Sequence, residues 1–213
     1  MKIIDVKRLA LPEVKVISFQ RFKDERGYFT EIYRKDHFDE HPDLQEFKNK
    51  NFVQYNESYS KINTIRGMHF QWNPKMGKLV RTIMGHMVDI VMDIRKGSPT
   101  FGKMIAYDMQ FDLDSDFGEF IWVPEGFAHG NFYLEDTKIN YFCTSGWNPV
   151  CEGSISPIAQ DIDWSMCDKK LKSKFDSIVN GSHLISDKDR DGFTLAQWTE
   201  NPNSNEFIYG PTS

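Results

Sequence analysis

Short runs rich in Val, Ile, Phe, Tyr and Thr recur along this chain, and Gly, Pro, Asn or Asp separates each run from the next. Such runs predict β-strands, because branched and aromatic side chains suit a pleated sheet while the separating residues favour turns. Many short strands of this kind predict an all-β fold, a sandwich or a barrel. The clearest strands are expected at residues 13–22, 27–33, 52–60, 79–94, 103–111 and 119–123.

Turns and helices are expected at a few further places. Residues 85–86, a Gly-His pair, lie between two apolar segments of the run 79–94, so we expect a hairpin there. Two segments, 35–47 and 165–178, have the spacing of amphipathic helices, and Pro42 predicts a break in the first. The sequence therefore predicts a mainly β fold with a few short flanking helices.

The length of the chain, 213 residues, suits a single domain, because β domains of this size commonly form one unit. Beyond Ser186 the sequence becomes polar and turn-rich, with isolated aromatic residues. We therefore expect one domain over residues 1–185 and a C-terminal appendage, residues 186–213, packed on or beside it.

Charge and patterning exclude several classes of function. The net charge is −5 and the isoelectric point is near 5.7, which argues against a nucleic-acid partner held by electrostatics. Residues 1–17 carry charges every few positions and lack the apolar run that a signal peptide or a membrane span needs. We therefore expect a cytoplasmic protein with no membrane segment. The three cysteines form no CxxC pair, which argues against a thiolate metal site.

The stretch IRGMHFQ, residues 65–71, places a histidine in a strand-like run beside an arginine and a glycine. Strict alternation along a strand would put Arg66 on one face, and His69 and Gln71 on the other. A single histidine on a strand is more often structural than catalytic, and the same holds for His129 in PEGFAHGN. Spacing alone does not show which face lies inside a barrel.

Four cations lie next to the histidine-bearing and glycine-bearing segments: Arg26, Arg66, Lys78 and Arg81. The default position of any Lys or Arg is a solvated surface. In an acidic protein, these four could instead gather around an anionic ligand. Tyr141, in INYFCTSGW, is by default a half-buried aromatic residue with its hydroxyl group at a rim.

Seven motif-bearing segments follow one another along the chain: DERGYFTE (24–31), FVQYN (52–56), NTIRGMHFQ (63–71), GKLVRTIMGHMVDIVMDIRKGSPTFG (77–102), IWVPEGFAHGN (121–131), YFCTSGWNPVCEGSI (141–155) and DIDW (161–164). In this order and spacing they resemble the nucleotide-diphospho-4-keto-sugar 3,5-epimerases, and the resemblance covers most of residues 1–164. It implies a cupin-type jelly-roll barrel, a homodimer, and a metal-free site inside the barrel that needs no cofactor.

The resemblance also implies a role for individual residues. His69 falls on the base that removes a proton next to the keto group. Lys78 falls near the developing enolate oxygen, and Tyr141 on the acid that returns a proton to the opposite face. Asp189, in LISDKD, falls on the aspartate that supports the base. Contacts to a nucleotide-diphosphate sugar are implied for Arg26, Glu31, Gln54, Asn56, Arg66, His129 and Glu152.

These residue types suit that chemistry. A hydrogen α to a ketone is weakly acidic, so its removal needs a positioned base whose pKa lies near the working pH, and histidine is such a base. A cation in a dry cavity stabilises the charge that moves to the ketone oxygen. Inversion requires a proton from the other face, and therefore a second group across the ring. A carboxylate on the second ring nitrogen fixes the tautomer of the base.

Two alternatives remain open. A metal-dependent cupin oxygenase is disfavoured because Gln71 stands where metal-binding cupins carry a further histidine, so we expect no catalytic metal. A non-catalytic cupin carbohydrate-binding module could keep the barrel, although it need not keep both a base and an opposing acid. The chain also has Gly146 and Trp147 where the family often has adjacent tyrosines, which leaves the nucleotide and the sugar unspecified.

Overall fold

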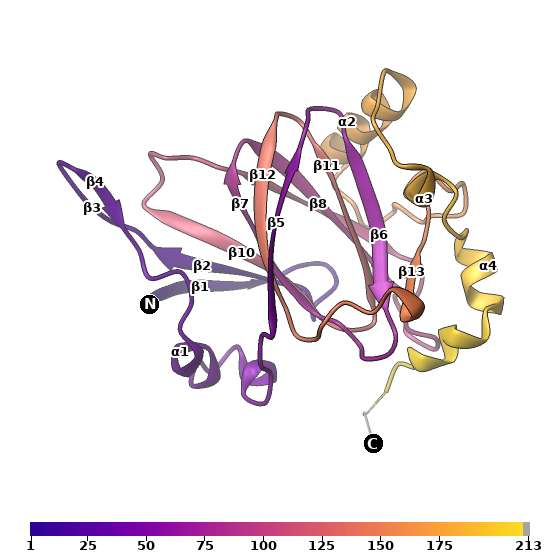
Figure 1. Ribbon diagram of the computed structural model, residues 1–213, viewed down its shortest axis with the longest axis horizontal. Helices are drawn as coiled ribbons and strands as arrows, with labels where there is room; N and C mark the ends of the chain where they lie inside the picture. Colours follow the sequence, from indigo (N-terminus) through magenta and orange to yellow (C-terminus); the bar gives the residue numbers. More distant parts are fainter. Residues whose placement is uncertain (211–213) are drawn as a thin grey trace.

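Two antiparallel β-sheets face each other in the computed structural model, which describes residues 1–210 (Figure 1). The six-stranded sheet contains, in spatial order, β1 (Ile3–Arg8), β2 (Lys15–Gln20), β10 (Phe117–Val123), β7 (Lys78–Met84), β12 (Thr137–Cys143) and β5 (Gln54–Ser60). The five-stranded sheet contains β13 (Glu152–Ser154), β6 (Ile65–Gln71), β11 (Phe127–Tyr133), β8 (His86–Asp93) and β9 (Met104–Gln110). This architecture confirms the predicted all-β, jelly-roll fold.

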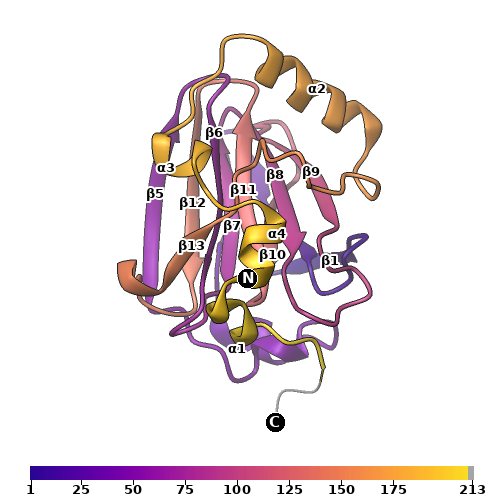
Figure 2. The ribbon, with the colours of Figure 1, turned by 90° about the vertical axis from the view of Figure 1, so that its right-hand side faces the viewer.

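The helical segments are short and lie outside the two sheets (Figures 1 and 2). They are α1 (Lys35–Asp39), η1 (Gln45–Phe47), η2 (Pro149–Cys151), α2 (Lys169–Asn180), α3 (Asp187–Arg190), α4 (Leu195–Glu200) and η3 (Pro202–Glu206). The break predicted at Pro42 is confirmed, since it separates α1 from η1. α2 begins at Lys169 because the Asp168 carboxylate accepts hydrogen bonds from two backbone N–H groups of its first turn. No helix within residues 1–210 is long and apolar enough to cross a membrane.

Apolar side chains fill the space between the sheets and also cover their outer faces. Between the sheets, Val80 and Ile121 belong to the same buried cluster as Val91 and Phe127 of the opposing sheet. A second cluster joins the outer face of the six-stranded sheet to α1 and η1. A third joins the five-stranded sheet to α2 and to the C-terminal segment. Burial of this apolar surface is the main force that holds the layers together.

The predicted hairpin at residues 85–86 is wrong. β7 pairs with β10 and β12, whereas β8 pairs with β9 and β11, so the two consecutive strands lie in opposite sheets. The chain crosses between the sheets at Gly85, whose φ is +80°, and His86 N donates a hydrogen bond to Thr137 Oγ1 at 2.9 Å. A continuous apolar run does not distinguish a hairpin from such a crossover, because both place buried strands on either side of a turn.

The N-terminal strands also differ from their predicted limits. The strand predicted at 27–33 is only β4 (Gly27–Phe29), which pairs with β3 (Phe22–Asp24) in a hairpin that projects from the sandwich (Figure 1). All six residues of the hairpin are exposed, so its strands pack against no other described part of the chain that would lengthen them. β1 lies outside the predicted ranges because it is an edge strand whose mostly exposed, charged residues hide the apolar alternation.

The C-terminal segment lies along the β6–β13 side of the five-stranded sheet (Figure 2). Trp198 of α4 is fully buried, and its ring centroid lies 4.4 Å from that of Phe70 on β6. Phe193 joins the segment to the sheet through a backbone hydrogen bond to Ser154. The last three residues of the expected appendage, 211–213, lie outside the described residues.

Candidate active site

A cavity of about 130 Å³ lies between the two sheets. Its lining combines histidine, lysine, arginine and tyrosine side chains, and it contains most of the residues predicted to act in catalysis. The lining residues are Ser58, Arg66, His69, Lys78, His129, Gly130, Asn131, Tyr133, Ile139 and Tyr141. The sandwich thus brings together residues that are far apart in the sequence.

The two histidines come from neighbouring strands of the five-stranded sheet, where His69 and His129 are register partners. A Cβ atom at Gly67 would lie 2.6 Å from the Cα atom of Gly130, so only glycine permits this close approach of β6 and β11. The predicted alternation is wrong at this point, because Arg66 and His69 line the same cavity. The register between the two strands shifts there, which is a β-bulge, and such an irregularity re-aims a side chain.

His69 forms a pair with Asp189 of α3. Its Nε2 atom lies 2.7 Å from Asp189 Oδ1, and the Ser186 side chain caps the helix by accepting a hydrogen bond from the Asp189 backbone N–H. Burial acts to raise the pKa of Asp189, but the hydrogen bonds to its carboxylate outweigh burial, and the pKa lies below its ordinary value. An ionised carboxylate only accepts hydrogen bonds, so in the neutral ring Nε2 carries the proton and Nδ1 holds the free lone pair.

His129 forms a second such pair, with Asp89 of β8. The distance from His129 Nε2 to Asp89 Oδ2 is 2.7 Å, and both side chains are buried. Burial raises the pKa of Asp89, against the opposing effect of His129. Sequence reasoning missed Asp89. The available signal was the single carboxylate inside the apolar run MVDIVM, residues 87–92, since a buried carboxylate requires a partner.

Lys78 and Tyr141 face the histidines from the six-stranded sheet. They lie on adjacent strands, β7 and β12, whose register pairs Tyr141 with Val80. Burial lowers the pKa of Lys78, and burial raises the pKa of Tyr141. The phenol of Tyr141 therefore remains protonated at neutral pH, and it is able to donate a proton. A cation and a phenol on one sheet thus oppose a histidine–aspartate pair on the other.

The rest of the lining is polar and hydrogen-bonded. Arg66 Nε donates to Ser60 Oγ at 2.8 Å, which fixes the guanidinium beside the cavity. The Tyr133 hydroxyl group donates to Asn131 Oδ1 at 2.7 Å. Asn131 and Tyr133 were not predicted as site residues. They follow His129 at steps of two along β11, so strand alternation from His129 would have found both.

Three predicted substrate contacts, Gln54, Asn56 and Glu152, do not line the cavity. They lie on β5 and β13, which pair with β12 and β6, two strands that carry lining residues. Asn56 is the register partner of Tyr141, and Gln54 Oε1 accepts a hydrogen bond from Trp147 N at 2.9 Å. The Glu152 carboxylate accepts a hydrogen bond from Lys188. Burial acts to raise the pKa of Glu152, but its hydrogen bond with Lys188 and the charge of that lysine lower it overall.

Arg26 and Glu31 lie away from the cavity of their own chain. Arg26 is at the turn between β3 and β4, where its side chain is 84% exposed and pairs with Asp24 at 2.6 Å. Glu31 forms an ion pair with the N-terminal amino group and lies 3.9 Å from Arg34. A single chain therefore does not bring these two predicted residues to the candidate site.

Gln71 does not contribute to a group of metal ligands. Its amide nitrogen donates to Pro74 O at 2.7 Å, and its amide oxygen accepts from Asn148 N at 2.7 Å. Across residues 1–210, no group of three or more His, Cys, Asp and Glu side chains is arranged to hold a metal ion. The expectation of a metal-free site stays a prediction.

Comparisons with known proteins place this geometry in context. A family model described as dTDP-4-dehydrorhamnose 3,5-epimerase matches residues 8–197. The protein of that name from Neisseria gonorrhoeae is 36% identical to this chain. The matched region covers 91% of this chain but only 53% of the length of that protein. The Pseudomonas aeruginosa protein of the same name is 35% identical, over 89% of this chain and 94% of its own length.

Solved structures agree with the sequence comparison. The dTDP-6-deoxy-D-glucose-3,5-epimerase from Legionella pneumophila, crystallised with dTDP-4-keto-L-rhamnose, superposes with a TM-score of 0.77 and 27% identity. The match covers 98% of this chain and 99% of that chain. The family predicted from the motifs is thereby confirmed, and the chain belongs to the dTDP-4-dehydrorhamnose 3,5-epimerase family.

Proposed function

We propose that the protein is an isomerase that inverts C3, C5 or both in a nucleotide-diphosphate 4-keto sugar, such as dTDP-4-keto-6-deoxyglucose. The observation that carries this proposal is the placement of two proton-transferring groups on opposite walls of one cavity. The His69–Asp189 pair belongs to the five-stranded side, and Tyr141 belongs to the six-stranded sheet. A sugar ring between the walls would present one face to each group.

Proton removal falls to His69. Asp189 holds Nε2–H, which leaves the Nδ1 lone pair to accept the proton next to the keto group. The ionised carboxylate stabilises the imidazolium that forms, because a charge-assisted hydrogen bond is stronger than a neutral one.

Lys78 stabilises the enolate. Removal of the proton moves negative charge to the ketone oxygen, and an ammonium group in a buried cavity stabilises that charge more strongly than it would in water. Lys78 lines the same cavity as the base and approaches from the opposing sheet. From there its ammonium group would contact the enolate oxygen of a sugar bound in the cavity.

Tyr141 completes the inversion. Because burial raises its pKa, the phenol holds its proton at neutral pH until the enolate carbon accepts it. Reprotonation by Tyr141 occurs on the face opposite His69 and therefore gives the epimer. Reprotonation by His69 would regenerate the starting sugar.

Substrate binding is assigned to groups around the cavity. Arg66 and His129 line it, and Arg66 suits bidentate contact with a phosphate. Asn56 is the register partner of Tyr141, Gln54 donates a hydrogen bond to Asn56, and Glu152 lies on the strand paired with β6. From there they would contact the sugar or the nucleotide. We propose no cofactor and a cytoplasmic location, where nucleotide sugars are available.

We also propose that two copies form a homodimer. The β3–β4 hairpin projects from the sandwich and exposes 51% of Phe22 and 71% of Phe29, more apolar surface than a free hairpin normally presents to water. Arg26 lies in the turn of this hairpin, and Glu31 lies two residues after its end. In a dimer, the hairpin of one copy would bring them to the site of the other.

The activity is tested by incubating the protein with dTDP- and GDP-linked 4-keto sugars in D2O and following deuterium at C3 and C5 by NMR. We expect wash-in at one or both carbons, and loss of wash-in for His69→Ala with the fold intact by circular dichroism. The matched control is His41→Ala, a histidine in the α1–η1 connection, which should behave as the unaltered protein. No exchange with any sugar would instead support a carbohydrate-binding module without catalysis.

The dimer is tested by mixing two inactive variants, Arg26→Ala and His69→Ala. If Arg26 acts on the partner's site, a mixed dimer contains one complete site and activity reappears on mixing. Absence of complementation, together with a monomeric mass in sedimentation, would refute the dimer while leaving the chemistry of the site untouched.

A further inference from the structure

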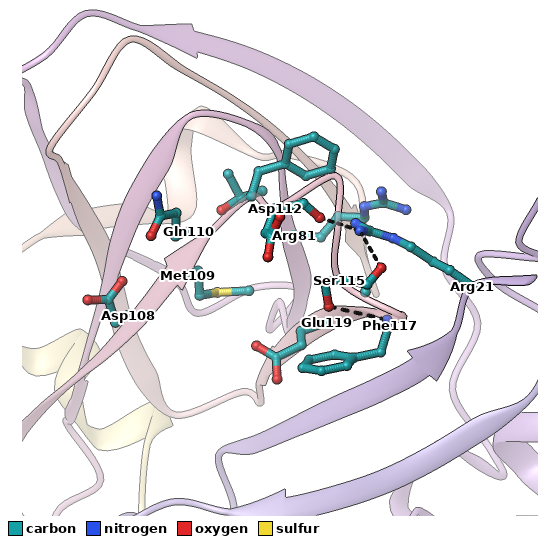
Figure 3. A pocket seen from close by; sticks show the side chains of 12 residues that line it. Arg21, Arg81, Asp108, Met109, Gln110, Asp112, Ser115, Phe117 and Glu119 are labelled. Atoms are coloured by element: carbon teal, nitrogen blue, oxygen red, sulfur yellow. Dashed lines mark hydrogen bonds between the residues drawn. The ribbon is translucent and has the colours of Figure 1, made fainter. Parts of the chain in front are cut away.

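A second cavity, of about 310 Å³, lies where the loop between β9 and β10 meets β7 and the residue preceding β3 (Figure 3). It shares no lining residue with the candidate active site. Two arginines, Arg21 and Arg81, contribute to its lining. Neither has a part in the proposed epimerisation.

Both arginines are buried, since only 5% of Arg21 and 7% of Arg81 is exposed. The Arg81 guanidinium carbon lies 5.5 Å from the ring centroid of Phe19 and 5.8 Å from that of Phe120, while Arg21 stacks on Tyr28 at 4.6 Å. Aromatic faces attract a guanidinium but do not accept the in-plane hydrogen bonds of its N–H groups. Those N–H groups need oxygen acceptors from elsewhere.

Arg21 finds such acceptors and Arg81 does not. Arg21 Nη1 donates to the backbone oxygen atoms of Asp112 and Ser115. Arg81 Nη1 is buried with no hydrogen-bond partner, and no ion pair is formed by Arg81 within residues 1–210. Burial lowers the pKa of Arg81, and the positive charge of Arg21 acts in the same direction. A buried cation without a counter-charge is destabilising.

The three carboxylates of the lining, those of Asp108, Asp112 and Glu119, do not supply that counter-charge. Asp112 Oδ1 accepts a hydrogen bond from Asp114 N at 2.8 Å. Glu119 accepts a hydrogen bond from the Tyr107 hydroxyl group at 3.2 Å. Asp108 pairs with His86 and lies 3.6 Å from Lys174. Figure 3 shows the carboxylates of Asp108 and Glu119 directed away from the two guanidinium groups. The acids of this cavity are therefore occupied by other donors.

We propose that this cavity binds a small oxyanion of the phosphate class through the guanidinium groups of Arg21 and Arg81. A tetrahedral oxyanion offers several acceptor oxygens to two guanidinium groups at once, and such charge-assisted contacts are among the strongest hydrogen bonds in proteins. The anion supplies the negative charge and the acceptors that no described side chain gives to Arg81.

Inorganic phosphate is the probe, titrated into the full chain by calorimetry at constant ionic strength. We expect saturable binding that is weakened at least about tenfold in Arg81→Met, because hydrogen bonds to charged groups are lost. Arg66→Met, which alters the candidate active site, should retain this binding. Arg8→Met, an exposed arginine of β1, is the matched control. If Arg81→Met fails to fold, Arg81→Lys, which keeps the charge but loses the planar fork, should still weaken binding.

A second titration, with thymidine diphosphate, separates the sources of the anion. If the cavity also accepts nucleotide phosphates, the unaltered chain binds two molecules and Arg81→Met binds one. If it takes only free phosphate, the two proteins bind thymidine diphosphate alike, and the proposal still holds. Equal affinity of both proteins for inorganic phosphate overturns it. So does weaker self-association of Arg81→Met with unchanged phosphate binding, since a carboxylate of a second copy would then be the partner of Arg81.

Discussion

Replacement of Asp189 by asparagine tests the proposed base more directly than removal of His69 itself. The side chain is nearly isosteric, and only 7% of it is exposed, so the change removes the charge and leaves the packing. The bond between His69 Nε2 and Asp189 Oδ1, at 2.7 Å, joins a developing cation to an anion. Such a bond contributes about 1.5–3 kcal/mol. If the bond reaches this strength only once His69 has taken the proton, losing it raises the barrier by the same amount. The reaction then slows about 10- to 150-fold.

The assay is the rate at which deuterium replaces the α-hydrogen of the 4-keto sugar in D2O. Asp187→Asn is the matched control, because Asp187 lies on the same helix with an 85% exposed side chain, paired with Arg190 at 2.7 Å. It should exchange at the rate of the unaltered protein. Exchange at that same rate by folded Asp189→Asn protein would refute the assignment of Asp189 to the base.

The Asp189→Asn change should also alter how the free energy of unfolding depends on pH. The pKa of Asp189 in the folded state lies below its ordinary value of about 3.9, so the ionised carboxylate stabilises the fold at neutral pH. That contribution is fully present above the ordinary pKa and is lost as the pH falls through the lower, folded value. The difference in unfolding free energy between the unaltered protein and Asp189→Asn, measured in urea, should therefore shrink below about pH 4. A difference independent of pH would show that folding does not lower the pKa of Asp189, and would contradict the bond between its ionised carboxylate and His69.

Two further changes probe the site, and a third probes the docking of the C-terminal segment. Tyr141→Phe removes the acid but not the base, so product formation should slow far more than deuterium wash-in, and equal slowing of the two would count against the acid role. Lys78→Met removes the cation beside the enolate oxygen and should lower the exchange rate by on the order of ~100-fold at unchanged fold, as followed by NMR. Trp198→Ala should lower the unfolding free energy by about 3–5 kcal/mol in urea denaturation, because a fully buried ring leaves a cavity against Phe70.

The sequence predicts the class of fold well because strand composition and turn residues are local properties. It does not predict which strands become neighbours: the apolar run around Gly85 looked like a hairpin and is a crossover between sheets. In the site, alternation failed at Arg66 and His69 because a bulge shifts the register, and a bulge has no clear sequence signal apart from Gly67. Arg26 was predicted as a substrate contact, yet it lies away from the cavity of its own chain.

The His69–Asp189 pair shows why motifs locate what periodicity does not. Its two residues are 120 positions apart, and Asp189 lies on a helix of four residues that has no apolar face to indicate its place. α3 is held on either side: residue 184 bridges to the start of β6, and Phe193 bridges to Ile155. Trp198 packs against Phe70, the residue next to His69. The docking of the C-terminal segment and the orientation of the base therefore depend on the same strand, so a substitution that loosens Trp198 should disturb the His69–Asp189 bond before it unfolds the sheets.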